Sequence, residues 1–173
     1  MVSSGSIPTK RAHSIAVTKN ANGFAKLGHS VDLLTVERIE ERKNRQSLGD
    51  VNDYYDISDD VSIEYFRDRS PFYYNDHALL GYLPSALRIV THGKAQRVLD
   101  PEQRISDACV STDYDICYCR SYRSAEYNVR RGIPTIVETH NPDPTSRHLD
   151  ILLEEANRDA FRGLVTISDQ LRE

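Results

Sequence analysis

The chain has 173 residues, of which 39% are hydrophobic and 28% are charged, and 22 basic against 26 acidic residues give a net charge of -4. This length and composition are typical of one folded globular domain, and they exclude a disordered or fibrous chain. The acidic balance, with no basic run along one face, also argues against nucleic acid as a partner.

The chain carries no recognisable signal for membrane insertion or export. No stretch approaches the roughly 18 apolar residues of a membrane-spanning helix, and residues Met1 to Gly5 lack the charged-then-apolar order of a signal peptide. We therefore expect a cytoplasmic protein. The odd number of cysteines predicts no disulfide framework, and we expect Cys117 and Cys119 to be small buried residues on one face of a strand.

The amino-terminal half alternates between helical and extended apolar periods. The predicted elements are a helix over Lys10–Leu27 ended by Gly28, a strand over Ser30–Val36, a strand near the sheet edge over Val61–Phe66, and a helix over Asn75–Leu99 that Pro84 kinks or splits. The segment Glu37–Asp60 is polar, and we expect its charge cluster Glu40–Lys43 to be a solvated loop or helix face. In the first helix we expect these apolar residues to face inward: Ala12, Ile15, Ala16, Phe24 and Leu27.

The carboxyl-terminal half continues the same alternation. Its predicted elements are strands over Asp115–Cys119, Pro134–His140 and Leu164–Ser168, helices over Ser124–Arg131 and Leu149–Phe161, and the start of another helix at Asp169. Strands that alternate with helices favour parallel pairing. We therefore predict an α/β fold with a Rossmann-like, doubly wound, mainly parallel sheet.

Both ends of the chain interrupt this pattern. A helix near Lys10 should follow a complete strand, which is usually central in such a sheet, but only Met1 and Val2 precede the polar turn Ser3–Ser6. At the other end, the helix that Asp169 begins has barely one turn. We therefore expect residues 1–173 to be one Rossmann-like domain that is truncated at both ends.

Three parts of the chain, in this order, resemble glycosyltransferase family four, whose members have the two-domain GT-B architecture. They are the loop Ser3–Ser14 with the "GHxVxLLT" type strand in Ala25–Thr35, the pair of segments Tyr114–Ser121 and Arg131–Asn141, and the segment Gly163–Leu171. The resemblance covers nearly the whole chain.

The resemblance implies that this is the amino-terminal, acceptor-side domain of a retaining glycosyltransferase. Its partners would be an absent carboxyl-terminal domain, which holds a nucleotide-sugar donor through a Glu-x7-Glu type motif, and a sugar or lipid-linked acceptor. The donor is a substrate, so no cofactor is expected, and basic groups of the absent domain would stabilise the leaving diphosphate without a metal. The domain alone should be inactive. Peripheral contact with a membrane stays open.

Candidate ligand-binding residues follow the predicted strands, because ligands of open parallel sheets bind at the carboxyl ends of the strands. In the first loop, Gly5 lets the backbone approach a ligand, and Lys10 and Arg11 offer charge to a phosphate at a helix start. His13 is a weaker candidate in the same segment. Arg120 follows a strand, where its guanidinium can fork onto a phosphate or carboxylate. A solvated helix entrance and a surface ion pair are the structural alternatives.

His140 is the catalytic candidate. It follows the predicted strand over Pro134–His140 at its carboxyl end and, by resemblance, matches the active-site histidine that touches the donor sugar. Asn141 comes next in the same turn and is a substrate-binding candidate. The alternative is that His140 packs within the loop.

Three other functions compete with this interpretation. A nucleotide-sugar 2-epimerase would begin with a similar half, and the chain also fits a remnant or stand-alone module that binds a sugar or nucleotide. A classical NAD dehydrogenase is disfavoured because the sequence lacks the GxGxxG fingerprint.

Overall fold

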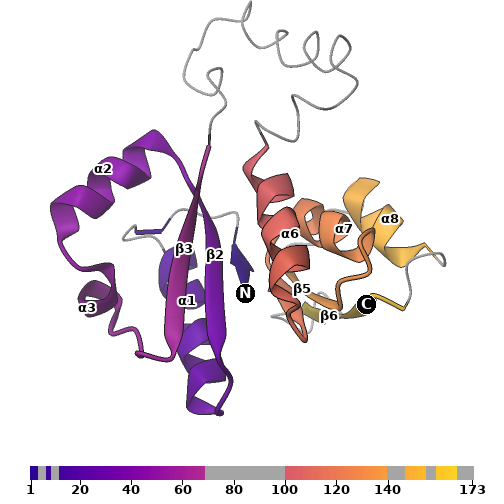
Figure 1. Cartoon of the computed structure of the whole chain (residues 1–173), viewed down its shortest axis with the longest axis horizontal. Helices are drawn as coiled ribbons and strands as arrows, with labels where there is room; N and C mark the ends of the chain where they lie inside the picture. Colours follow the sequence, from indigo (N-terminus) through magenta and orange to yellow (C-terminus); the bar gives the residue numbers. More distant parts are fainter. Residues whose placement is uncertain (4–6, 9–11, 69–99, 140–146, 155–158, 167–173) are drawn as a thin grey trace, which may run out of the picture.

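The computed structural model describes residues 1–3, 7–8, 12–68, 100–139, 147–154 and 159–166 (Figure 1). Its elements are β1 (Val2–Ser3), α1 (Ala12–Lys26), β2 (Val31–Glu37), α2 (Ile39–Leu48), α3 (Val51–Tyr55), β3 (Val61–Arg67), α6 (Pro101–Thr112), β4 (Cys117–Cys119), α7 (Tyr122–Val129), β5 (Thr135–Thr139), α8 (Arg147–Leu153) and β6 (Phe161–Thr166). The six strands form one sheet in which every pair is parallel. The predicted α/β, Rossmann-like doubly wound fold is confirmed.

The strand order β3-β2-β1-β4-β5-β6 places the short first strand in the middle of the sheet. From β1 the chain builds outward through β2 and β3, then returns to the other side of β1 and builds outward again through β4, β5 and β6. Val2 pairs with Leu34 on one side and with Cys119 on the other. The direction of winding therefore reverses between β1 and β4, which is the topological switch point where such sheets bind ligands.

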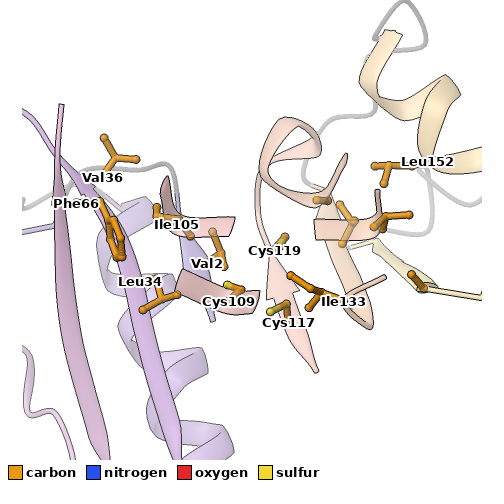
Figure 2. Packing of buried hydrophobic residues seen from close by; sticks show 14 residues of the cluster. Val2, Leu34, Val36, Phe66, Ile105, Cys109, Cys117, Cys119, Ile133 and Leu152 are labelled. Carbon is orange, nitrogen blue, oxygen red and sulfur yellow. The ribbon is translucent and has the colours of Figure 1, made fainter. Parts of the chain in front are cut away.

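Helices cover the two faces of the sheet with separate apolar cores. On one face, α1 and α3 pack over Val31 and Leu33 of β2 and Val61 of β3. On the other face, α6, α7 and α8 contribute to a core that extends over the strands from Phe66 of β3 to Phe161 of β6. Figure 2 shows this core, with Val2 lying between Leu34 of β2 and the cysteines of β4.

The cysteines belong to this second core. Cys109 of α6 and both Cys117 and Cys119 of β4 are buried and free. The two strand cysteines are one pleat repeat apart and therefore face the same side of the sheet. The prediction that they are small buried residues is confirmed.

Helix α6 is absent from the sequence-based expectations. Its start is well marked, because Pro101 occupies the first turn and the Asp100 side chain accepts a hydrogen bond from the Glu102 backbone N–H at 3.0 Å. Its apolar side is short, however, and centres on Ile105 and Cys109. The longer leucine-rich segment Asn75–Leu99, predicted as a helix, lies outside the described residues.

Several predicted boundaries and faces are wrong. The helix predicted over Leu149–Phe161 ends at Leu153, because Phe161 pairs with Thr135 and begins β6. Two residues predicted to face inward from the first helix are exposed instead: Ile15 in α1 is 40% exposed, and Leu27, just after α1, is 76% exposed. The helix instead buries smaller residues, which let it lie close to the sheet: Ser14, Val17, Thr18, Ala21 and Ala25. The polar segment Glu37–Asp60 contains two short helices, α2 and α3.

None of the helices in the described ranges combines the length and apolar character needed to cross a membrane.

Replacing Leu34 tests the position of the sheet core. Leu34 is 1% exposed, so Leu34→Ala should lower the free energy of unfolding by about 2–5 kcal/mol through lost burial and a residual cavity. Leu27→Ala is the matched control. Leu27 is 76% exposed, and its loss should change stability by no more than about 0.5 kcal/mol. Urea unfolding of both variants measures the difference, and equal effects would contradict this core.

Candidate functional site

A row of polar side chains crosses the sheet at the carboxyl ends of its central strands. The strand registers pair Tyr65 with Thr35 and Thr35 with Ser3. Val2 pairs with Cys119, and Cys119 pairs with Val137. The residues that follow these three in the chain are Ser3, Arg120 and Glu138, so Arg120 and Glu138 continue the same row. We call Tyr65, Thr35, Ser3, Arg120 and Glu138 the polar row. It spans the switch point between β1 and β4.

The polar row lies on the sheet face that α1 covers. Leu33 in β2 and Ile63 in β3 lie two residues before Thr35 and Tyr65, and therefore on the same face. Leu33 belongs to the apolar core beneath α1, and Ile63 packs against that core. The helix changes character in parallel, since Ser14 and Thr18 are buried near its start whereas Ala21 and Ala25 are buried near its end. The interface between α1 and the sheet therefore becomes polar at the edge where ligands bind.

An ion pair between Arg120 and Glu138 forms the centre of the polar row. Arg120 Nη2 lies 3.1 Å from Glu138 Oε1, and the two side chains are only 2% and 3% exposed. Arg120 Nη1 also donates to the backbone carbonyl of His13 at 3.3 Å. The backbone N–H of Arg120 donates to the Val2 carbonyl at 3.2 Å. Arg120 is thus in an ion pair within the protein, as the structural alternative expected, but the pair is buried rather than at the surface.

Two further side chains hold the Glu138 carboxylate. The Tyr118 hydroxyl donates to Glu138 Oε2 at 2.7 Å, and Asn20 Nδ2 of α1 donates to the same oxygen at 3.1 Å. Burial of the Tyr118 ring and its bond to the Glu138 carboxylate both raise the pKa of Tyr118 above its usual range. With donors from β4, α1 and Arg120, the carboxylate is fixed in orientation.

His13 joins the polar row from the first turn of α1. Its Nε2 shares a hydrogen bond of 3.2 Å with Ser3 Oγ. A serine and a histidine at this distance are the elements of an activated nucleophile. Ser3, however, has no exposed surface, so its hydroxyl does not face a substrate. The contact instead orients the imidazole, which is partly exposed at the carboxyl edge of the sheet.

The structure therefore brings together two of the predicted site residues, Arg120 and His13. The other predicted site residues lie outside the described ranges, and their roles stay predictions: Gly5, Lys10, Arg11, His140 and Asn141.

Sequence reasoning missed Glu138, Asn20 and Ser3 as parts of the site. A signal for Glu138 was present, because it is the one charged residue in the apolar run Thr135–Thr139 and lies near the end of a buried strand. A carboxylate in such a strand needs a buried partner, and Arg120 follows the preceding strand. Asn20 carries no such signal, since its contact joins residues 118 positions apart.

Within the described part of the chain, no three His, Cys, Asp or Glu side chains gather in an arrangement that could hold a metal ion. The expectation that the reaction needs neither metal nor cofactor stays a prediction. The polar row thus holds hydrogen-bond donors and acceptors in fixed positions, most of them buried, and the partly exposed His13 ring lies at its edge.

Comparisons of the chain with protein-family models, with curated proteins and with solved structures find no match.

Neutralising Glu138 tests the importance of the ion pair. Glu138→Gln keeps the shape of the side chain but leaves the Arg120 charge buried without a counterion, and we expect it to cost about 3–5 kcal/mol of stability. Denaturant unfolding measures this change. In the double variant Arg120→Met with Glu138→Leu, most of the loss should be recovered, because neither charge remains.

The control is the ion pair of Arg131 with Asp107. Arg131 Nη2 lies 2.7 Å from Asp107 Oδ1, but the Asp107 side chain is 54% exposed. Asp107→Asn should cost less than about 1 kcal/mol, as is usual for exposed pairs. A Glu138→Gln variant as stable as Asp107→Asn would show that the Arg120–Glu138 pair does not hold this edge together.

Proposed function

We propose that the chain is the amino-terminal, acceptor-side domain of a retaining glycosyltransferase, which transfers a sugar from a nucleotide-sugar donor to an acceptor hydroxyl. The observation that carries the proposal is the polar row at the switch point, centred on the buried Arg120–Glu138 pair. Ligands of open parallel sheets bind at this place. The resemblance of the sequence to glycosyltransferase family four adds the class of reaction.

The electrostatics of the polar row suit an acceptor that is rich in hydroxyl groups. Arg120 and Glu138 neutralise each other, so this pair adds no net charge at the centre of the row. The partly exposed His13 ring, oriented by Ser3, lies at the edge of the row. Rigid polar groups of this kind position a hydroxyl for reaction, and positioning supplies much of the rate acceleration in such transfers.

In the proposed reaction the acceptor oxygen bonds to the anomeric carbon of the donor sugar, and the proton of the acceptor hydroxyl passes to the departing diphosphate. The bond from that carbon to the nucleotide diphosphate breaks, and the diphosphate leaves. Charge develops on the diphosphate, and the donor-binding domain would stabilise it with basic groups and helix amino-termini. His140 would contact the donor sugar on the acceptor-side domain.

Nucleotide-sugar turnover tests this proposal. We expect the protein expressed from its full coding frame to release nucleotide diphosphate from a UDP- or GDP-sugar, and the 173-residue chain alone to release none. His140→Ala should lower kcat by about 10²–10³-fold if the side chain stabilises the transition state. The exposed His29 supplies the control, because His29→Ala should leave kcat unchanged.

Product analysis separates the competing functions. A transferred sugar with retained anomeric configuration supports the proposal, whereas an epimerised nucleotide sugar would identify a 2-epimerase. Turnover by the 173-residue chain alone, or full activity of His140→Ala, would overturn the assignment of roles made above.

A further inference from the structure

The β2–β3 end of the polar row holds a second polar group with no role in the proposed reaction. It consists of Glu37 at the end of β2, Tyr65 and Arg67 in β3, and Arg45 in α2. We call these four residues the β2–β3 cluster. Glu37 pairs with Arg67 in the sheet and lies two residues beyond Thr35, the partner of Tyr65. Glu37, Tyr65 and Arg67 therefore share one face of the sheet, the face that α1 covers.

The Glu37 carboxylate uses only one of its oxygens for hydrogen bonds. Its side chain is 1% exposed, and Oε1 lies 2.9 Å from Arg45 Nε and 2.7 Å from Arg45 Nη2. The other oxygen, Oε2, is buried and accepts no hydrogen bond from any described residue. Arg67 Nε is 3.8 Å away, which is too long for a hydrogen bond, and the Arg67 side chain is 60% exposed.

The Tyr65 hydroxyl is in the same situation. It is buried, and no group in the described ranges of the chain pairs with it. Arg45 connects the two sites, because the guanidinium that binds Glu37 also lies over the Tyr65 ring, 4.4 Å from the ring centre. Burial, opposed by the nearby Arg45 charge, raises the pKa of Tyr65 to about 12. The hydroxyl therefore keeps its proton and can donate it in a hydrogen bond.

Unsatisfied buried polar atoms are uncommon in native proteins, and two of them in one cluster indicate a ligand that pairs with both. A carboxylate oxygen only accepts hydrogen bonds, whereas a tyrosine hydroxyl donates and accepts. The complementary ligand carries one hydroxyl that donates to Glu37 Oε2 and a second that accepts from Tyr65. Neighbouring hydroxyls on a sugar ring have this chemistry.

We propose that the β2–β3 cluster is a binding site for a vicinal hydroxyl pair of a sugar ring, with Glu37 and Tyr65 as the contacting residues. The exposed Arg67 side chain moves away from Glu37 Oε2 when the ligand enters. This site goes beyond the proposed function, which uses Tyr65 only as a member of the polar row and assigns no ligand contact to any residue of the cluster. The sugar ring is either a free hexose unit, as in an acceptor, or the ribose of a nucleoside. An acidic residue at the end of the second strand binds ribose hydroxyls in other Rossmann-type domains.

A binding measurement on the 173-residue chain tests the site without any need for turnover. The probes are D-glucose, D-mannose, adenosine and 2′-deoxyadenosine, titrated into ¹⁵N-labelled protein and followed by NMR. We expect at least one hexose, or adenosine, to shift the amide signals of Arg45 and Tyr65. Adenosine binding that 2′-deoxyadenosine does not reproduce identifies ribose as the source, and hexose binding identifies an acceptor sugar.

Tyr65→Phe is the decisive variant, because it removes the hydroxyl but keeps the ring under Arg45. We expect its Kd for the bound probe to rise about tenfold, as for the loss of one hydrogen bond. Tyr54, which is 39% exposed on the neighbouring α3, gives the control Tyr54→Phe with an unchanged Kd. The inference would be overturned if none of the four probes shifted a signal of the cluster, or if the Kd were unchanged in Tyr65→Phe.

A stability measurement distinguishes a ligand site from a hydroxyl that is already satisfied within the fold. The ligand-free Tyr65→Phe protein should unfold at the same denaturant concentration as the wild type or higher. Tyr118→Phe should unfold at a lower one, because the Tyr118 hydroxyl donates to Glu138 at 2.7 Å. Destabilisation of Tyr65→Phe to the same extent would mean that an ordered water or a protein group already binds the hydroxyl, and would contradict the proposed site.

Discussion

The buried ion pair of Arg120 and Glu138 is the interaction on which this edge of the sheet depends. Both side chains are almost completely removed from solvent, and such burial is costly unless each charge finds partners. The partners come from three places: Tyr118 in β4, Asn20 in α1 and the backbone of His13 at the start of α1. The pair therefore ties α1 to β4 and β5 at the switch point, where packing of apolar side chains gives way to polar contacts.

The short β1 makes this arrangement possible. Val2 is paired with a strand on each side and lies in the apolar core of one face, whereas Ser3 is paired with Thr35 of β2 and lies in the polar row of the other face. Through Ser3 the polar row runs without a break from Tyr65 in β3 to Glu138 in β5. The centre of the row is an internally neutral pair, and its β2–β3 end has hydrogen-bonding capacity left over at Glu37 and Tyr65.

The sequence by itself determined the fold class and most of the elements. Alternation between helical and extended periods is a local property, so it located β2, β3, β4 and β5 to within a few residues, and it indicated buried strand cysteines at Cys117 and Cys119. Local patterns also singled out Arg120, because a cation directly after a strand in an α/β fold lies at the ligand-binding edge. The pattern was less reliable for α1, where buried serine and threonine residues replace the apolar side expected from Ile15 and Leu27.

Only the tertiary structure decided what these residues contact. Glu138 and Arg120 are 18 positions apart in the chain, and Asn20 and Glu138 are 118 apart, so no local pattern links them. Register between parallel strands aligns Tyr65, Thr35 and Ser3, and register follows from packing of the whole sheet. Likewise, the sequence shows Glu37 only as the first residue of a polar segment. In the structure, α2 places Arg45 beside Glu37, where its guanidinium binds one carboxylate oxygen. The local sequence therefore determines which residue types lie at this edge of the sheet, whereas the pairing of the strands determines which of them contact one another.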